Sequence, residues 1–294
     1  MDVERSAPEQ PAWAVVVTSP PISVLAAHVP PPPHRTRWVA LGALLAAGLA
    51  VIAAGAVVGD GGTKPPARAA SQPLRPGSVK GMPGASYAVT WVGATGQPVR
   101  WDPCRPVRWV NNPASAPAGA LEETQAAFAR LADATGIEFV YAGATDEAPA
   151  VDRDEAQARY GDGWAPILVA WAPLNGTVLG AGLGTMPDTV GVSTPAALSR
   201  PGDPSVIVSA QVVLEPGRAL MPGFGSSEAR GAVILHELAH ALGLGHVPDP
   251  TQLMFVGNAT TSGPGELQAG DLAGLAALGA AGGCVRGPDP SLRG

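Results

Sequence analysis

The segment 236–246, which reads HELAHALGLGH, constrains this chain more than any other part of its sequence. The chain has five histidines among 294 residues, and three of them lie in this segment. The other two, His28 and His34, belong to a proline-rich leader. Any domain that folds after residue 34 therefore has all its imidazole groups in one short stretch. This concentration predicts a metal site.

The spacing of the three histidines suits a single ion. His236 and His240 are four residues apart, so on a helix their rings project from one face, about one turn apart. Two ring nitrogens so placed can each lie about 2.0–2.1 Å from one ion. Gly243 lets the helix end with a positive φ, after which His246 can turn back to the same ion. Three neutral imidazoles leave a fourth position open, as in catalytic zinc sites, and Glu237 lies where it can hold a water.

Two simpler interpretations compete with this one. The segment could be an ordinary amphipathic helix whose histidines are solvated or lie in the core. It could also contribute to a purely structural zinc site, but such sites need paired cysteines, and this chain has only Cys104 and Cys284. The third histidine and the intervening glycine favour the catalytic interpretation.

The same residues resemble a known family. HELAHALGLGH is similar to the HExxHxxGxxH signature of metzincin metallopeptidases, and Met254 falls where their Met-turn lies. Residues 246–254, HVPDPTQLM, resemble the matrixin branch, here of a bacterial, membrane-anchored type. Residues 267–278 resemble its C-terminal helix, although one of two adjacent acids usual there is Gly270, which leaves only Asp271. The resemblance covers about residues 227–278. It implies an α+β fold: a twisted mixed sheet with an active-site helix and a C-terminal helix.

The resemblance also implies a function, a zinc-dependent endopeptidase that hydrolyses extracellular proteins or peptides. His236, His240 and His246 would hold the zinc, and Glu237 would be the catalytic residue, a general base that activates a water. Met254 would form a hydrophobic floor beneath the site. The alternative is a catalytically silent, metal-containing binding or scaffold protein at the cell surface.

The resemblance further bears on the number and kind of ions. Matrixins often hold a second, structural zinc through histidines that precede the active helix. This chain has none there after residue 34, so one zinc ion (Zn2+) is expected. A calcium ion (Ca2+) is retained as an additional ligand, bound by backbone carbonyls and acids such as Asp162, Asp188 or Asp203.

Upstream of this domain the chain changes character twice. Residues 1–37 are proline-rich and are expected to be disordered and cytoplasmic. Residues 38–59 are 22 uncharged residues, long enough for a transmembrane helix, and Arg35 and Arg37 precede them. Residues 60–84 read as a flexible linker, 85–284 as the peptidase domain and 285–294 as a tail. We therefore expect a single-pass protein of the cell membrane with an extracellular catalytic domain. A cleaved signal peptide, which would give a secreted protein, and a buried core helix are the alternatives.

Inside the domain, hydrophobic patterns predict the order of elements. Residues 99–110 read as extended, 121–134 as a helix closed by Gly136, and 137–141 and 167–171 as short strands. Residues 178–186 read as a weak, glycine-rich edge strand that could pair with a peptide, or else as a flexible loop. Residues 205–214 are a strong strand. A helix follows from an N-cap at Ser226 or Ser227 to about residue 242, and a final helix spans 266–278.

The two cysteines and the overall charge limit the remaining choices. Outside the cytoplasm, Cys104 and Cys284 would form a disulfide, which by loop entropy would stabilise the fold by roughly 5 kcal/mol. The alternative is that Cys104 blocks the zinc, as in matrixin zymogens, but its surroundings, DPCRP, do not match the family's PRCGxPD. The net charge is −6 and no basic block occurs, so nucleic acid is not an expected partner. The expected partners are a protein or peptide substrate and the membrane.

Overall fold

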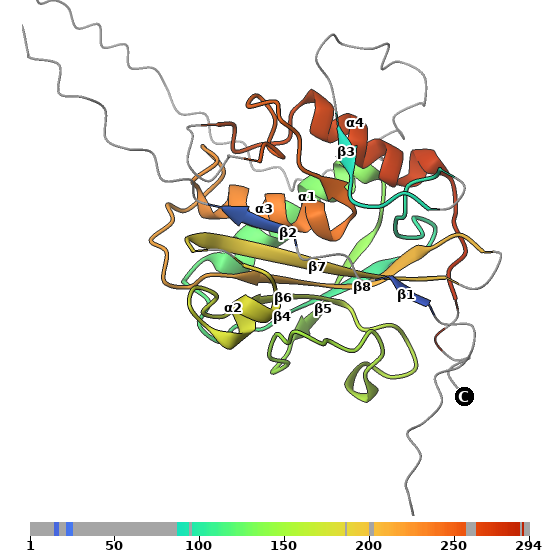
Figure 1. Cartoon of the computed structure of the whole chain (residues 1–294), viewed down its shortest axis with the longest axis horizontal. Coiled ribbons are helices and arrows are strands. Elements are labelled where there is room, and N and C mark those ends of the chain that lie inside the picture. The colour runs from blue at the N-terminus through green and yellow to red at the C-terminus, as the bar shows by residue number, and fades with distance from the viewer. Residues whose placement is uncertain are drawn as a thin grey trace, which may run out of the picture. The chain divides into compact units, whose positions relative to one another are not determined.

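The computed structural model describes residues 87–93, 96–185, 187–199, 203–256, 263–288 and 290, and the backbone of residues 15–17 and 22–25. These residues form an α+β domain, as expected. Three helices, α1 (Ala120–Thr135), α3 (Arg230–Ala241) and α4 (Ala269–Leu278), cover one face of a mixed sheet. The short helix α2 (Val178–Gly182) lies on the other face, together with residues 145–166 (Figure 1).

Five strands form the body of the sheet: β4 (Val107–Asn111), β5 (Phe139–Ala144), β6 (Ile167–Trp171), β7 (Thr189–Ser199) and β8 (Val206–Leu214). Their order is β7-β8-β6-β4-β5. β4 runs parallel to β5 and β6, and β6 runs parallel to β8, whereas β7 is antiparallel to β8. Helix α3 packs against β7 and β8, so two of the three histidines lie over the antiparallel side of the sheet.

The central strands of the sheet are buried on both faces. Every residue of β6 and β8 is buried, because helices cover one side and α2 and its flanking segments cover the other. One of two smaller core clusters, which packs against Leu179 of α2, consists of Leu174, Leu183, Val192 and Val213. Strands enclosed in this way read as nearly continuous apolar runs. This is why residues 167–171 and 205–214 could be predicted as strands from their composition alone.

Helix α1 agrees closely with its prediction. Its buried residues, which include Ala127, Phe128 and Leu131, recur at helical spacing and face the main core. Gly136 ends the helix with φ of 69°, and its N–H donates to the carbonyl of Ala132. A glycine in this left-handed conformation closes a helix without the steric penalty that a Cβ would bring.

Helix α3 begins later than predicted. Its N-cap is Ala229 rather than Ser226 or Ser227, and the Ser227 hydroxyl instead accepts a hydrogen bond from the N–H of Gly263. The start of the helix is held by an ion pair, in which Arg230 donates to Glu123 of α1 at 2.5 Å. Contacts with another element therefore fix the first turn of α3, and a local cap does not.

The prediction of an edge strand at residues 178–186 is wrong. Residues 178–182 form α2, whose N-cap Thr177 accepts a hydrogen bond from the N–H of Gly180. The strand at this side of the five-stranded body is β7, which begins at Thr189. Gly191 and Pro195 lie inside β7 and both weaken a strand pattern, so the sequence did not reveal it.

Two short segments of the leader pair with β7. β1 (Val15–Val17) and β2 (Ile22–Leu25) run antiparallel to it, opposite residues 197–199 and 189–193 respectively. Residues 15–17 and 22–25 belong to the segment that was expected to be disordered, and they form regular structure here. With them, the sheet has seven strands.

The two cysteines form the expected disulfide. Cys104 and Cys284 are bonded, with their Cα atoms 5.4 Å apart and a sequence separation of 180 residues. Since both sulfurs are engaged, Cys104 does not act as a metal ligand. A disulfide of this kind indicates an oxidising compartment. Residues assigned to the tail also contact the domain, because the indole N–H of Trp164 donates to the carbonyl of Pro288 at 3.2 Å.

The expected membrane span at residues 38–59 lies outside the described residues, as does the expected linker at residues 60–84. Among the helices that are described, none is both long and apolar enough to cross a bilayer.

Candidate metal centre

Helix α3 carries two of the three histidines on one face, as their spacing predicted. His236 and His240 are both buried, and their ring centroids are 4.7 Å apart. The indole N–H of Trp101 donates to the carbonyl of Ala241 at 2.9 Å, which anchors the end of the helix. The two imidazoles therefore project from a rigid, fully packed element.

A glycine turn brings the third histidine back to the first two. Gly243 has φ of 101°, and the chain then forms β9 (Leu244–Gly245), which pairs with β3 (Ala88–Val89). His246 follows at once, and its Nε2 lies 3.1 Å from Nε2 of His236 and 3.0 Å from Nε2 of His240. The predicted convergence of the three rings is thus present.

The other ring nitrogens fix how these rings are protonated. Nδ1 of His236 lies 2.8 Å from the carbonyl of Leu253, and Nδ1 of His240 lies 2.7 Å from the carbonyl of Leu244. A carbonyl oxygen only accepts hydrogen bonds, so each Nδ1 carries the hydrogen and donates it. In the neutral rings, Nε2 of His236 and of His240 then bears a lone pair, and both lone pairs are directed at His246.

Burial keeps the three rings neutral. It lowers the pKa of His236 to about 3, with a further contribution from His246, and lowers the pKa of His246 to about 4. Burial and the two neighbouring rings also lower the pKa of His240 well below its usual value. A single N–H on His246 can donate to only one of the two facing lone pairs. Three such nitrogens fit a metal ion such as zinc, which the cluster could hold.

Glu237 follows His236 in α3, and its carboxylate has no hydrogen-bond partner among the described residues. Its side chain is 0% exposed. Burial raises the pKa of Glu237 well above its usual value. Native structures rarely leave a buried carboxylate unsatisfied, because this is energetically unfavourable.

The segment around Met254 is held by a carboxylate whose structural role the sequence did not reveal. Asp271 accepts hydrogen bonds from the backbone N–H groups of Leu253, Met254 and Gln268, at 2.8, 3.2 and 2.8 Å. Burial raises the pKa of Asp271, and these hydrogen bonds partly oppose that rise. Since the Leu253 carbonyl accepts from His236, Asp271 supports that ring indirectly. Its spacing from the N-cap Gln268 of α4, a capping box, was the signal that could have revealed it.

Met254 itself is buried in the main core at 1% exposure. Its carbonyl accepts a hydrogen bond from the N–H of Val247 at 2.9 Å. The residue therefore links the chain just after His246 to the segment that supports His236.

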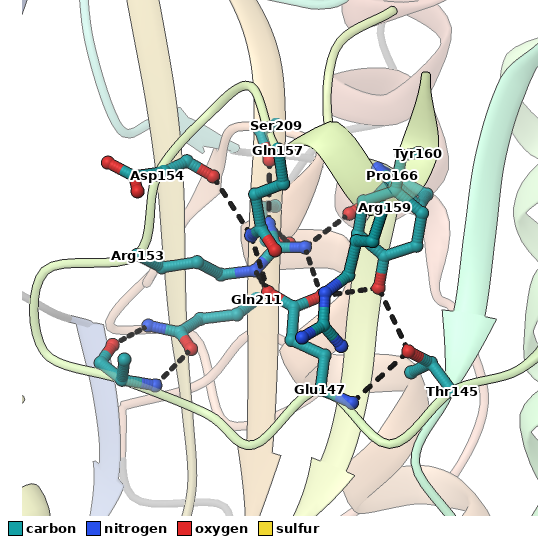
Figure 2. Close-up of polar contacts among 12 residues, drawn as sticks. Thr145, Glu147, Arg153, Asp154, Gln157, Arg159, Tyr160, Pro166, Ser209 and Gln211 are labelled. Carbon is teal, nitrogen blue, oxygen red and sulfur yellow. Dashed lines mark hydrogen bonds and ion pairs between the residues drawn. The ribbon is translucent and has the colours of Figure 1, made fainter.

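A second buried cluster of charged and polar groups lies on the other face of the sheet (Figure 2). The carboxylate of Glu147 accepts from Arg153 at 2.8 and 3.1 Å, from Gln157 at 2.6 Å and from Tyr160 at 2.5 Å. Arg153 also donates to Ser209 and to the carbonyls of Ala210 and Pro166. This cluster ties residues 145–166 to β8.

The acids suggested for calcium do not come together. Asp162, Asp188 and Asp203 are all exposed, and within the described part of the chain none of them belongs to a group of three or more candidate ligands. Asp188 lies 3.6 Å from Arg218, in an exposed ion pair.

A scan against protein-family models matches none of them to this chain, and a search of curated proteins finds no match either. The resemblance of residues 236–254 to matrixins therefore stays an expectation. What the structure establishes is a mixed α+β domain with a buried cluster of three histidines on and just after a helix.

Proposed function

We propose that the protein is a zinc-dependent endopeptidase, matrixin-like within the metzincins, that hydrolyses peptide bonds of extracellular proteins or peptides. One observation carries the proposal: the carboxylate of Glu237, which is fully buried and has no hydrogen-bond partner among the described residues, belongs to the residue directly after a histidine of the three-histidine cluster. The ligands are His236, His240 and His246, and Glu237 is the catalytic residue.

The state of Glu237 favours catalysis over a purely structural metal site. A structural site needs its ligands and their hydrogen bonds, and the carbonyls of Leu253 and Leu244 already provide those for two of the rings. A buried carboxylate without donors adds nothing to such a site and destabilises the fold. A general base, in contrast, needs free lone pairs and a pKa raised toward neutrality.

The reaction uses the residues of the cluster in separate roles. The three imidazoles would hold the ion, and the Nδ1–H groups of His236 and His240 stay engaged with backbone carbonyls so that these two rings cannot turn away. When bound, a zinc ion would supply Lewis acidity that acidifies a water and polarises the scissile carbonyl. Glu237 takes a proton from the water as its oxygen bonds to the carbonyl carbon. It then passes this proton to the amine nitrogen as the C–N bond breaks.

The outer edge of β7 is the proposed position of an extended peptide substrate. Helix α3 packs against β7, and Gly191 of β7 lies next to Glu237, so a peptide at this edge would pass near the site. The pairing of β2 with residues 189–193 supports this, because it is an extended segment held antiparallel at the same edge. Strand addition of this kind recognises main-chain groups and tolerates many sequences. A peptide substrate must displace β2 before it can bind at this edge of β7.

The proposed function also requires the catalytic domain to lie outside the cytoplasm. The disulfide indicates an oxidising compartment. We propose that residues 38–59 anchor the protein in the cell membrane with the catalytic domain outside, the alternative being secretion after cleavage of a signal peptide.

Two variants of the full-length chain test the mechanism, with zinc content and cleavage of a denatured protein mixture as the measurements. We expect Glu237→Ala to retain one zinc per chain and to lose cleavage by about 100-fold or more, because the ligands remain while the base is gone. We expect His240→Ala to lose the metal and the activity together. A chelator should abolish cleavage by the wild type.

Glu228→Ala is the matched control, since Glu228 is exposed just before the same helix. It should retain both zinc and cleavage. Undiminished cleavage by Glu237→Ala would refute the proposed mechanism. A wild type that retains zinc but cleaves nothing in the mixture would instead favour the silent binding or scaffold protein.

A further inference from the structure

Gly191 of β7 lies against the side chain of Glu237. Its backbone is not in the left-handed region, so its conformation suits any residue. Space is what excludes a side chain: a Cβ at Gly191 would lie 2.8 Å from Cγ of Glu237, 2.9 Å from Oε1 and 3.0 Å from Cδ. Carbon and oxygen atoms do not approach a Cβ so closely without a shift in structure.

Neither neighbour of this contact can easily move away. Gly191 is paired antiparallel with Leu214 of β8, which is 0% exposed and is itself paired with Trp171 of β6. Glu237 is in the middle of α3, beside His236, whose ring is held by the Leu253 carbonyl. The strand cannot retreat without breaking the sheet, and the helix cannot retreat without moving a metal ligand. An added methyl group would therefore change the rotamer of Glu237 itself.

Packing alone orients this carboxylate. Neither oxygen has a hydrogen-bond partner among the described residues, and the side chain is 0% exposed, so neither polar contacts nor bulk water fix its direction. A catalytic base must be held within a fraction of an ångström of its working position. The backbone of β7 at Gly191 lies so near the end of the Glu237 side chain that a Cβ there would overlap it, and the strand is therefore able to do this.

We propose that Gly191 is a positioning residue for Glu237. Because it lacks a side chain, the backbone of β7 closes directly over the glutamate and restricts it to one rotamer. The expected effect on catalysis rests on the proposed function. The packing of Gly191 against Glu237 does not depend on that function. The same strand would thus serve two purposes, binding an extended peptide along its edge and holding the general base against its face.

The test compares Gly191→Ala with Gly163→Ala in the full-length protein. Gly163 is the matched control, because its φ is also outside the left-handed region and a Cβ there meets nothing within 4 Å. We expect Gly191→Ala to retain one zinc per chain and to lose about 100-fold in kcat with little change in KM, since a displaced base slows the chemistry rather than binding. Gly163→Ala should match the wild type.

A second measurement separates positioning from general damage to the fold and needs no catalysis. Gly191→Ala should lower Tm by roughly 3–10 °C in the wild-type background. In a Glu237→Ala background the clash is gone, so the same change should lower Tm by much less. An equal fall in both backgrounds, or unchanged kcat in an active enzyme, would overturn the inference. If the wild type proves inactive on all peptides, the proposed function fails, and the Tm comparison still decides whether Gly191 and Glu237 are in contact.

Discussion

Two buried glutamates occupy opposite faces of the same sheet, and they differ in almost every respect except burial. Glu147 is 6% exposed and Glu237 is 0% exposed. Glu147 accepts four hydrogen bonds from Arg153, Gln157 and Tyr160 (Figure 2), whereas Glu237 accepts none from the described residues. The first carboxylate is fully satisfied by the fold, and the second is not satisfied at all.

Their pKa values move in opposite directions for this reason. Burial alone would raise the pKa of Glu147, but the hydrogen bonds from Arg153, Tyr160 and Gln157 bring it below its ordinary value. Burial raises the pKa of Glu237, and nothing opposes it. A satisfied carboxylate stabilises a structure, while an unsatisfied one beside a metal cluster is available to react. The comparison separates a structural network from a candidate catalytic group by contacts alone.

The largest expected effect on stability concerns Glu147, whose carboxylate is fully hydrogen-bonded. Glu147→Ala should lower the free energy of unfolding by about 3–5 kcal/mol, because it leaves the buried guanidinium of Arg153 without its ion partner. Urea denaturation at pH 7 measures this change. Asp146→Ala is the control, since Asp146 pairs with Arg159 on the surface, where such pairs contribute about 1 kcal/mol or less. A loss at Glu147 no greater than at Asp146 would show that the network does not hold residues 145–166 in place.

The sequence predicted the cluster of three histidines better than it predicted the sheet around it. The convergence of the three histidines, the glycine turn at Gly243 and the disulfide follow from local or pairwise signals, and each was confirmed in position. Strand β7 was misplaced because Gly191 and Pro195 conceal its pattern. The space left by Gly191 matters only because α3 packs against β7, and no local pattern encodes that contact.

Most contacts of the carboxylate networks could not be predicted, for a related reason; the exception is the capping box between Gln268 and Asp271. Glu147 and Arg153 are close in sequence, but Arg153 also bonds Ser209, which is 56 residues away. Asp271 supports the Met254 segment from 17 residues away, across a turn. Such contacts arise once the fold has formed. The sequence gives the residues that can ionise, whereas the tertiary structure decides which of them are satisfied.

The second prediction concerns how the Glu147 network depends on pH. A carboxylate whose pKa is lowered by folding contributes stability that is fully present above its unfolded pKa, about 4.3, and is lost as pH falls through its folded pKa. The free energy of unfolding should therefore fall more steeply below about pH 4.3 in the wild type than in Glu147→Gln. The difference should be about 1.4 kcal/mol for each unit by which the two pKa values differ.

Denaturation of both proteins at several pH values between 3 and 6 measures this difference. Subtracting the variant removes the contribution of the three histidines, which is common to both. Parallel curves would mean that Glu147 titrates alike in the folded and unfolded chains, and the contrast with Glu237 would then lose its electrostatic basis.

The smallest expected effect concerns Glu237, whose carboxylate has no hydrogen-bond partner among the described residues. Here the substitution should stabilise the fold instead of destabilising it. In metal-free protein at pH 7, Glu237→Gln should raise the free energy of unfolding by about 1 kcal/mol, whereas Glu147→Gln should lower it. A carboxylate whose pKa is raised by folding stabilises the fold only below its unfolded pKa, and this stability is lost as pH rises toward the folded value. The amide of glutamine has nearly the same shape and cannot ionise, so it avoids that loss.

The gain is small because the amide would itself be buried without partners. Thermal and urea denaturation in the presence of a chelator compare the two variants with the wild type, and Glu228→Gln serves as the exposed control. If Glu237→Gln destabilised the metal-free fold as Glu147→Gln does, Glu237 would have to be a structural acceptor. The proposed division between a satisfied carboxylate that holds the fold and an unsatisfied one that reacts would then be wrong.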